Sequence, residues 1–398
     1  MKNQQPKTVI EYEEIKSSEI GKPFKELEEF AKQNPTILSF TRNGNLKSQN
    51  YVGIIQTKSG FVLEILPKIS DKEDKDKDKS KAMLLRMLKT LKDSPFKNYQ
   101  MANLKIENLP IFEIFIKMFL DELGILIRKG IKSDYVLQEE NLPYLKGKLK
   151  ISRHIIKNLI HKEKFFVEFD EYMQNRIENQ IIKTTLLFLQ RKTKRFQRLI
   201  REYLFTFDGI DKVYDVKSAF TKVNLDRTIK YYENVLSFCK VFLLHKSFSP
   251  YKGDSIAFAL LFDMNRLFED YVGSCFKKHY KNVVLQHREY HLLKQKDKKL
   301  FSLRPDIYLK DKNKNIILDT KWKIIKEEND ISQSDLYQMF AYAVRYDCKE
   351  VYLIYPKIYD LNLKIDEFEF CGMEDRKLYV RFFDISEDFE KKNCIEFE

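Results

Sequence analysis

Short apolar stretches separated by turn-forming residues dominate the start of the chain. TILSFTR, YVGIIQT and FVLEILP, within residues 36–67, are rich in β-branched and aromatic residues and are separated by NGN and KSG, which predicts strands joined by turns. PFKELEEFAKQ at 23–33 predicts a short helix with Pro23 in its first turn. Residues 71–81 carry five acidic residues and five lysines, so we expect a solvated, mobile loop there. Residues 1–100 are therefore predicted to form a β-rich N-terminal domain.

In the middle of the chain, apolar residues recur at spacings of three and four. KAMLLRMLKTLKD, LPIFEIFIKMFLDELGILIRKG and IENQIIKTTLLFLQRKTKRFQRLIREYLF all follow this pattern, which is typical of amphipathic helices. EKFFVEFDEY interrupts them and predicts a strand. We therefore expect a mainly helical middle region over residues 101–250.

The last third of the chain mixes both patterns. Residues 255–280, SIAFALLFDMNRLFEDYVGSCFKKHY, are predicted to form one long helix. Strands are expected near 283–286, 303–309 and 315–320, followed by a helix at 332–347 and the strand EVYLIYP. This order predicts a small α/β domain over 251–398, and an α+β multidomain fold for the whole chain.

Composition narrows the class of protein. The chain has 398 residues, a formal net charge of +13 and 33% charged residues, which fits a polyanionic partner such as DNA. Its five cysteines include no C-x-x-C pair, and the N-terminus lacks an apolar signal core, so we expect a soluble, cytoplasmic protein with no membrane partner. No G-x-x-x-x-G-K-[ST] sequence occurs, so any nucleotide hydrolysis must come from another protein.

Two aspartates and a lysine stand on an otherwise apolar hairpin, RPDIYLKDKNKNIILDTKWK, at residues 304–323. Because side chains alternate along a strand, Asp319 and Lys321 should point to the same face. The KDKNKN turn should fold the preceding strand back, so that Asp306 approaches Asp319. Two carboxylates beside an ammonium suit Mg²⁺, with the lysine orienting a water or stabilising charge on a phosphate.

The pattern P-D-(x)n-[D/E]-x-K resembles that of the restriction-type, or PD-(D/E)XK, nuclease superfamily. The resemblance implies further roles for residues outside the hairpin. Glu269, in the sequence FED, lies where the superfamily often places a further acid, which implies a third metal ligand beside Asp306 and Asp319. Gln338 and Tyr342 are four residues apart on a predicted helix, so they share one face. The same Gln-x-x-x-Tyr pair marks a nuclease subgroup.

A longer series of motifs resembles the McrC family, the nuclease subunits of McrBC modification-dependent restriction systems. The similar segments, in family order, are VLEILPKI, EENLPYLKGKLKISRHI, FVEFDEYMQNRIENQIIKTTL, MNRLFEDYV, RPDIYL, ILDTKWK, DLYQMFAYA and YLIYP. Gln180 replaces the usual arginine of the family, and Lys146 and Lys148 also replace arginines. The Asp306, Asp319 and Lys321 positions match the family pattern without change.

This resemblance implies an endodeoxyribonuclease that hydrolyses phosphodiesters with Mg²⁺, for which Mn²⁺ can substitute. It implies a partner, a McrB-like AAA+ GTPase ring that recognises modified cytosine. The N-terminal domain, residues 1–100, would dock into this ring and stimulate GTP hydrolysis. We also expect that the nuclease domain at 251–398 can mediate dimerisation. Two alternatives stay open: a stand-alone repair or recombination nuclease, and a non-catalytic activator of an AAA+ GTPase.

Overall fold

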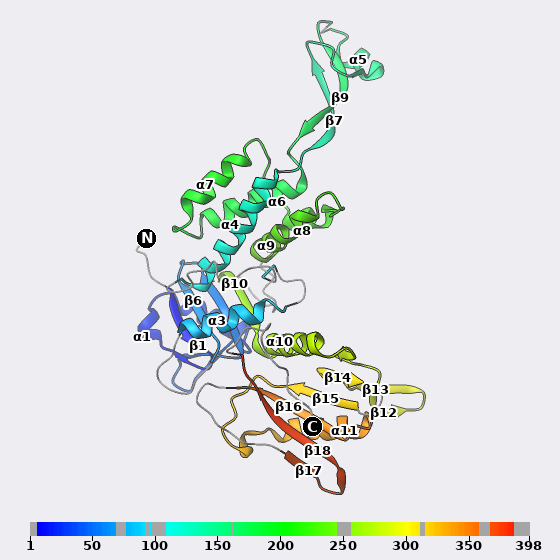
Figure 1. Ribbon diagram of the computed structural model, residues 1–398. Coiled ribbons are helices and arrows are strands. Elements are labelled where there is room, and N and C mark those ends of the chain that lie inside the picture. Colours follow the sequence, from blue (N-terminus) through cyan, green and yellow to red (C-terminus); the bar gives the residue numbers. More distant parts are fainter. Residues whose placement is uncertain are drawn as a thin grey trace. The chain divides into compact units, whose positions relative to one another are not determined.

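The computed structural model of the chain describes residues 6–68, 77–91, 95–96, 109–160, 162–244, 256–310, 315–357 and 367–385. Its mixture of helices and sheets confirms the predicted α+β fold class (Figure 1). The residues group into two compact units, one made of Met1–Ile111 and Ser247–Glu398 and the other of Phe112–Lys246. The predicted division at residues 100 and 250 stays a prediction. No helix in the described part of the chain is both long and apolar enough to cross a membrane.

The N-terminal part of the first unit is built on a four-stranded sheet. Its order is β1-β6-β5-β10, with β1 parallel to β6 and the other neighbours antiparallel. The strands are β1 (Lys7–Ile10), β5 (Tyr51–Thr57), β6 (Val62–Leu66) and β10 (Ile256–Asp263). A smaller sheet and three helices accompany it, namely β2 (Glu14–Ile15), β3 (Leu38–Phe40), β4 (Leu46–Ser48), α1 (Ser17–Ile20), α2 (Phe24–Gln33) and α3 (Lys77–Leu88).

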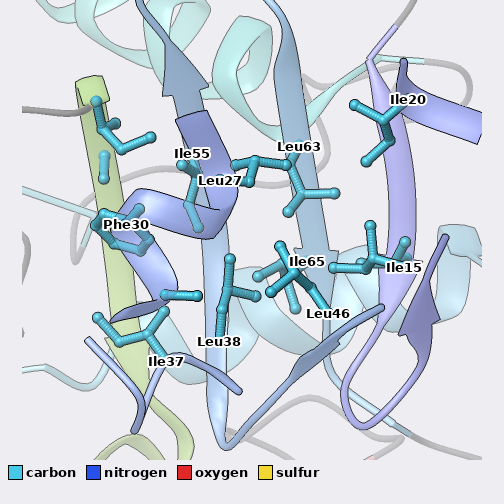
Figure 2. Packing of buried hydrophobic residues seen from close by; sticks show 14 of the residues in the cluster. Ile15, Ile20, Leu27, Phe30, Ile37, Leu38, Leu46, Ile55, Leu63 and Ile65 are labelled. Atoms are coloured by element: carbon cyan, nitrogen blue, oxygen red, sulfur yellow. The ribbon is translucent and has the colours of Figure 1, made fainter. Parts of the chain in front are cut away.

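Alternation of apolar residues explains how this sheet packs. Ile55 of β5 and Leu63 and Ile65 of β6 point toward the apolar face of α2, where Leu27 and Phe30 lie fully buried (Figure 2). Burying side chains of this size stabilises the fold by roughly 1.5–3 kcal/mol each. The predicted helix over 23–33 and the predicted strands of this region are confirmed.

One expectation for the last third of the chain was wrong, and the loop expected at 71–81 was wrong from Lys77 onward. Residues 255–280 do not form one helix, because Ile256–Asp263 is the strand β10 and the helix α10 (Met264–His279) begins only after it. A run of apolar residues suits a buried strand as well as a helix, and pairing with β5 decides in favour of the strand. Asp263 then caps α10 by accepting a hydrogen bond from the backbone N–H of Asn265 at 2.9 Å. The charged segment 71–81 lies partly outside the described residues, and its end, from Lys77, belongs to α3.

The second unit contains a group of helices and a β-arm. The helices are α4 (Ile111–Lys129), α6 (Ile177–Gln190), α7 (Gln197–Thr206), α8 (Val216–Lys222), the 3₁₀ turn η2 (Lys230–Tyr232) and α9 (Glu233–Leu243). Edge-to-face contacts of Phe119 with Phe238 and Phe242 join α4 to α9. The β-arm, defined here as residues 134–173, consists of β7 (Asp134–Leu142), β8 (Lys148–Leu149), α5 (Ile151–Lys157) and β9 (Phe165–Met173), and α5 lies at its far end from the helices (Figure 1).

The C-terminal sheet of the first unit has the order β11-β14-β15-β16-β18-β17. Its strands are β11 (Val283–Leu285), β14 (Ile307–Lys310), β15 (Asn315–Thr320), β16 (Glu350–Pro356), β17 (Glu367–Phe370) and β18 (Met373–Phe383), and a separate hairpin pairs β12 (His291–Gln295) with β13 (Lys298–Ser302). β14 and β15 are antiparallel, whereas β15 and β16 are parallel and are connected through η3 (Glu328–Asp330) and α11 (Gln333–Arg345). Two parallel neighbouring strands need such a crossover connection, and here α11 forms most of it, so that the helix packs on the sheet.

Candidate active site

The ends of β14 and β15 bring the two predicted aspartates onto neighbouring strands. Ile307 pairs with Leu318, so Asp306, which precedes β14, lies beside the last residues of β15. Its Oδ2 accepts hydrogen bonds from both the backbone N–H and the hydroxyl of Thr320, each at 2.7 Å. Asp319 is 2% exposed. The hairpin therefore holds two carboxyl groups at one end of the sheet.

Lys321 completes this arrangement immediately after β15. Its backbone N–H donates to the carbonyl of Ile354 on β16 at 2.9 Å, which fixes the main chain where the strand ends. Its ammonium lies 2.7 Å from Oδ2 of Asp319. Burial disfavours the charged form of Lys321, but Asp319, Asp335 and Asp306 together outweigh this and raise the pKa of the lysine. Lys321 therefore keeps its positive charge at neutral pH.

Glu269, from α10, is held by residues that the sequence patterns did not single out. Its Oε1 accepts a hydrogen bond from Nε2 of Gln286 at 2.6 Å, and the Gln286 amide oxygen accepts one from the guanidinium of Arg304. Gln286 has a φ of 51°, a left-handed conformation that is uncommon outside glycine. Arg304, two residues before Asp306, could have been noticed in the sequence. Gln286 could not, because its role depends on the meeting of β11 with α10.

The three acidic side chains act on one another. Burial, and then the charge of Asp319, raises the pKa of Asp306 to about 7, against the hydrogen bonds from Thr320. Burial, and then the charge of Asp306, raises the pKa of Glu269 to about 7. Burial raises the pKa of Asp319 too, assisted by other carboxyl groups including Glu269 and opposed by Lys321. The pKa values of all three carboxyl groups are therefore raised for the same two reasons, partial burial away from water and repulsion between neighbouring negative charges.

Such a donor set fits a hard divalent cation, because carboxylate oxygens are its preferred ligands and its charge would offset their repulsion. Within the described residues, no group of three or more His, Cys, Asp or Glu side chains is arranged as a ready-made metal site. Thr320, Lys321 and Gln286 instead engage the three carboxyl groups.

The helix α11 supplies the second pair of predicted residues. Oε1 of Gln338 accepts a hydrogen bond from Nζ of Lys321 at 3.0 Å, and Nε2 of Gln338 donates to the hydroxyl of Tyr342 at 2.8 Å. Asp335, one turn earlier on the same helix, lies 3.5 Å from the same ammonium. The sequence contained this signal, because a residue three positions before Gln338 shares its face. The six predicted site residues thus lie in one unit, on or directly next to α10, β14, β15 and α11, and each of them interacts with another member of the set.

Comparison with known proteins places this site in a family context. The chain matches the family model described as McrBC 5-methylcytosine restriction system component over residues 46–356, a range that includes every residue of the site. Among curated proteins, it is similar to the type IV methyl-directed restriction enzyme EcoKMcrBC of Escherichia coli (strain K12), with 27% identity over 125 residues. That match covers 31% of this chain and 36% of the relative, so the chain spans about a third of the curated relative's length.

Two solved structures have a similar fold. One is a refined half-complex from a tetradecameric assembly of Thermococcus gammatolerans McrB AAA+ hexamers with bound McrC, in which the matching chain has a TM-score of 0.74 and 20% identity. The match covers 97% of this chain and 99% of that one. The other is a cryo-EM structure of the Thermococcus gammatolerans McrBC complex, with a TM-score of 0.50, 21% identity and coverage of 67% and 86%. At this level of identity, the likeness concerns the fold.

Proposed function

The chain belongs to the family of McrBC 5-methylcytosine restriction system components, and from this membership we propose that it is the DNA-cleaving subunit of a modification-dependent restriction system. The observation that carries the proposal is the convergence of Asp306, Asp319 and Lys321 at the end of the β14–β15 hairpin. The net charge of +13 supports a polyanionic substrate. The reaction is the hydrolysis of a phosphodiester.

The carboxyl groups of Asp306, Asp319 and Glu269 would hold Mg²⁺, for which Mn²⁺ can substitute. When bound, the ion polarises the phosphate and lowers the pKa of a water molecule. The surrounding residues keep the donors in place: Thr320 holds Asp306 through two hydrogen bonds, and Gln286 holds Glu269 through one. Such supporting contacts commonly change metal affinity or activity by about 10–100-fold.

Lys321 has the task of stabilising negative charge on the phosphate. Its ammonium is held between Asp319 and Gln338, and Gln338 is itself oriented by Tyr342. When DNA binds, one of these contacts would be exchanged for a phosphate oxygen or for the attacking water. A charged donor aimed at the developing oxyanion is commonly worth about a hundredfold or more in rate.

Cleavage assays test this assignment. Asp319→Asn and Lys321→Ala should each lower cleavage of modified DNA by at least about a hundredfold, with Mg²⁺ or Mn²⁺ supporting the wild-type reaction and Ca²⁺ failing to do so. GTP turnover by a McrB-like partner, stimulated by this chain, should stay unchanged. Near wild-type cutting by Asp319→Asn would refute the site. Cutting without any partner would favour the stand-alone nuclease, and GTPase stimulation without wild-type cutting would favour the non-catalytic activator.

We also propose that the chain binds an AAA+ GTPase ring, and the exposed surface favours the β-arm over residues 1–100 as the docking element. In the N-terminal part, only Tyr12 and Phe40 among the described large apolar residues are exposed. The β-arm exposes a group of them, namely Tyr135, Leu137, Tyr144, Leu145, Ile151, Ile155, Ile156, Leu159, Ile160 and Tyr172. Ile160 is 85% exposed and Ile156 78%. Such a concentration of apolar surface marks an interaction site.

A paired substitution distinguishes the two docking surfaces. Ile156→Ser together with Ile160→Ser should weaken partner binding and GTPase stimulation at least about tenfold, because each isoleucine that is buried on binding contributes roughly 1.5–3 kcal/mol. Phe40→Ser, on the N-terminal part, serves as the matched control and should have no effect. If Phe40→Ser weakened partner binding and the Ile156→Ser, Ile160→Ser variant did not, residues 1–100 would be the docking element. Dimerisation through the nuclease part stays a prediction, to be measured by sedimentation.

A further inference from the structure

A cleft of about 540 Å³ opens beside the candidate catalytic lysine, within the size range of roughly 300–1,000 Å³ that is common for ligand sites. One wall is the nuclease part itself, with Lys321, Lys323 and Asp335. Another part of the lining comes from the start of the chain, more than two hundred residues away in sequence, and includes Tyr12, Asn50 and Lys68. The N-terminal part therefore forms one side of the site.

The chemistry of these walls suits an anion. Of the described residues that line the cleft, three are lysines and one, Asp335, is acidic. Lys321 contacts Asp319 at 2.7 Å, and Lys68 and Lys323 add two further ammonium groups to the walls. The Asn50 side chain is engaged within the wall, because its carbonyl oxygen accepts a hydrogen bond from the Tyr12 hydroxyl at 3.2 Å and its amide nitrogen donates to Oδ1 of Asp263 at 3.5 Å. The lysine ammonium groups are therefore the part of the lining suited to phosphate oxygens along a nucleic-acid backbone.

A buried carboxyl group ties the two walls together. Oε2 of Glu11 accepts hydrogen bonds from the indole N–H of Trp322 at 3.1 Å and from the backbone N–H of Lys68 at 3.0 Å. Trp322 directly follows Lys321, and Glu11 directly precedes Tyr12. One side chain therefore fixes the N-terminal wall relative to the catalytic lysine.

The backbone of the N-terminal wall supports a functional role. Tyr12 has a φ of 64°, a left-handed conformation that costs a non-glycine residue about 1–2 kcal/mol. Conformations of this kind cluster at functional sites. Here it directs the Tyr12 side chain, which is 43% exposed, to the cleft.

We propose that this cleft binds a phosphate of the DNA backbone next to the one that is cleaved, through Lys68 and Lys323, so that the N-terminal part is a wall of the DNA site. The proposal rests on the nuclease function proposed above. It gives residues 1–68 a direct task in holding the substrate. It also predicts no base preference from this wall, because contacts to phosphates position DNA without reading its sequence.

Salt-dependent DNA binding tests the proposal separately from cleavage. In the full chain carrying Asp319→Asn, the affinity for a labelled duplex is measured at several salt concentrations. Lys68→Ala and Lys323→Ala should each weaken binding and lower the slope of log K against log salt by about 0.9, the value for one lost phosphate contact. The double variant should lose about 1.8. Lys68→Arg should retain the slope, because it keeps the charge.

Lys58→Ala is the matched control, since Lys58 is an exposed lysine between β5 and β6, outside the cleft. The Lys68 variants should keep their fold, because the hydrogen bond to Glu11 comes from the backbone of residue 68. An unchanged slope in the double variant, an equal effect of Lys58→Ala, or no binding of duplex by the full chain would overturn the proposal. Failure of Asp319→Asn to stop cleavage would instead refute the proposed catalytic site and leave the binding slopes interpretable.

Discussion

At the scale of single residues, the site combines groups that disfavour one another's charge. The pKa values of Asp306 and Glu269 are raised to about 7 by burial and by neighbouring carboxylates. Such repulsion disfavours the charged forms of the carboxyl groups, and a bound cation would offset it. Metal binding should therefore release protons near neutral pH, as is usual when carboxyl groups become ligands.

The first prediction concerns Glu269. Glu269→Gln removes a carboxylate donor but keeps the size of the side chain, and should lower cleavage by roughly tenfold or more. Raising the Mg²⁺ concentration should recover part of the lost rate if the residue acts on the metal. Glu289→Gln is the control, because the Glu289 side chain in the same domain is 82% exposed. Equal rates for both variants would place Glu269 outside the catalytic machinery.

The second prediction concerns Glu11, whose pKa burial raises from 4.5 to about 8. Between pH 4.5 and about 8 the folded chain keeps the Glu11 proton, whereas the unfolded chain releases it. The contribution of Glu11 to the stability of the fold is therefore fully present below about pH 4.5 and is lost as the pH rises through 8. Urea unfolding at pH 5 and pH 9 should show wild type losing on the order of 4 kcal/mol more than Glu11→Gln. Parallel losses in the two proteins would mean that Glu11 is ionised in the fold.

At the scale of elements, α11 links the core to the chemistry. Met339, Tyr342 and Ala343 are buried against the sheet, while Asp335 and Gln338 reach Lys321. Helical spacing separates these two groups of residues onto adjacent faces. Because α11 packs against the sheet through its buried residues, its Asp335 and Gln338 side chains hold the Lys321 ammonium in a fixed position.

The third prediction follows from that geometry. Gln338→Ala should remove the amide oxygen that holds Lys321 and lower cleavage roughly tenfold. Tyr342→Phe, which removes the hydroxyl that contacts Gln338 and the backbone of Arg304 but leaves the amide oxygen in place, should have a smaller effect. Gln333→Ala is the matched control, since Gln333 begins the same helix and bonds to the exposed Tyr337. If Gln333→Ala and Gln338→Ala behave alike, the helix contributes through packing alone.

At the scale of the whole molecule, the first unit is discontinuous in sequence. The strand β10, which begins at Ile256, completes the N-terminal sheet beside β5, and Ile256, Ala259 and Leu261 are buried in its core. The hydrogen bond between Glu11 and Trp322 joins the same two parts. A cut of the chain at residue 250 therefore divides one folded unit.

The fourth prediction is that a fragment of residues 1–250 is less stable than one of residues 1–263. The shorter fragment leaves the edge of β5 unpaired and exposes part of its core, at a cost of roughly 5 kcal/mol for the buried side chains of β10. An unpaired strand edge also promotes aggregation. Thermal unfolding and hydrogen exchange of β5 should show the difference. Equal protection of β5 in the two fragments would contradict it.

Sequence alone was sufficient where the signal is local. Turn residues, strand propensity and helical spacing predicted α2, β5, β6, β15 and α11, and the identities of Asp306, Asp319, Lys321, Glu269, Gln338 and Tyr342 followed from their spacing and from resemblance to a family. Alternation along β15 and the four-residue spacing on α11 depend only on neighbouring positions, so they can be read without the fold.

Only the tertiary structure decided what depends on distant partners. An apolar run such as residues 256–262 suits either a helix or a strand, and the choice came from the free edge of β5. The roles of Gln286, Glu11 and Trp322 arise where separate segments meet, and nothing in their local sequence marks them. The exposure of isoleucines on the β-arm likewise could not be foreseen, because the same spacing serves a buried face as well as an open one. Burial and long-range pairing are properties of the folded chain, and they determine which of several locally acceptable structures forms.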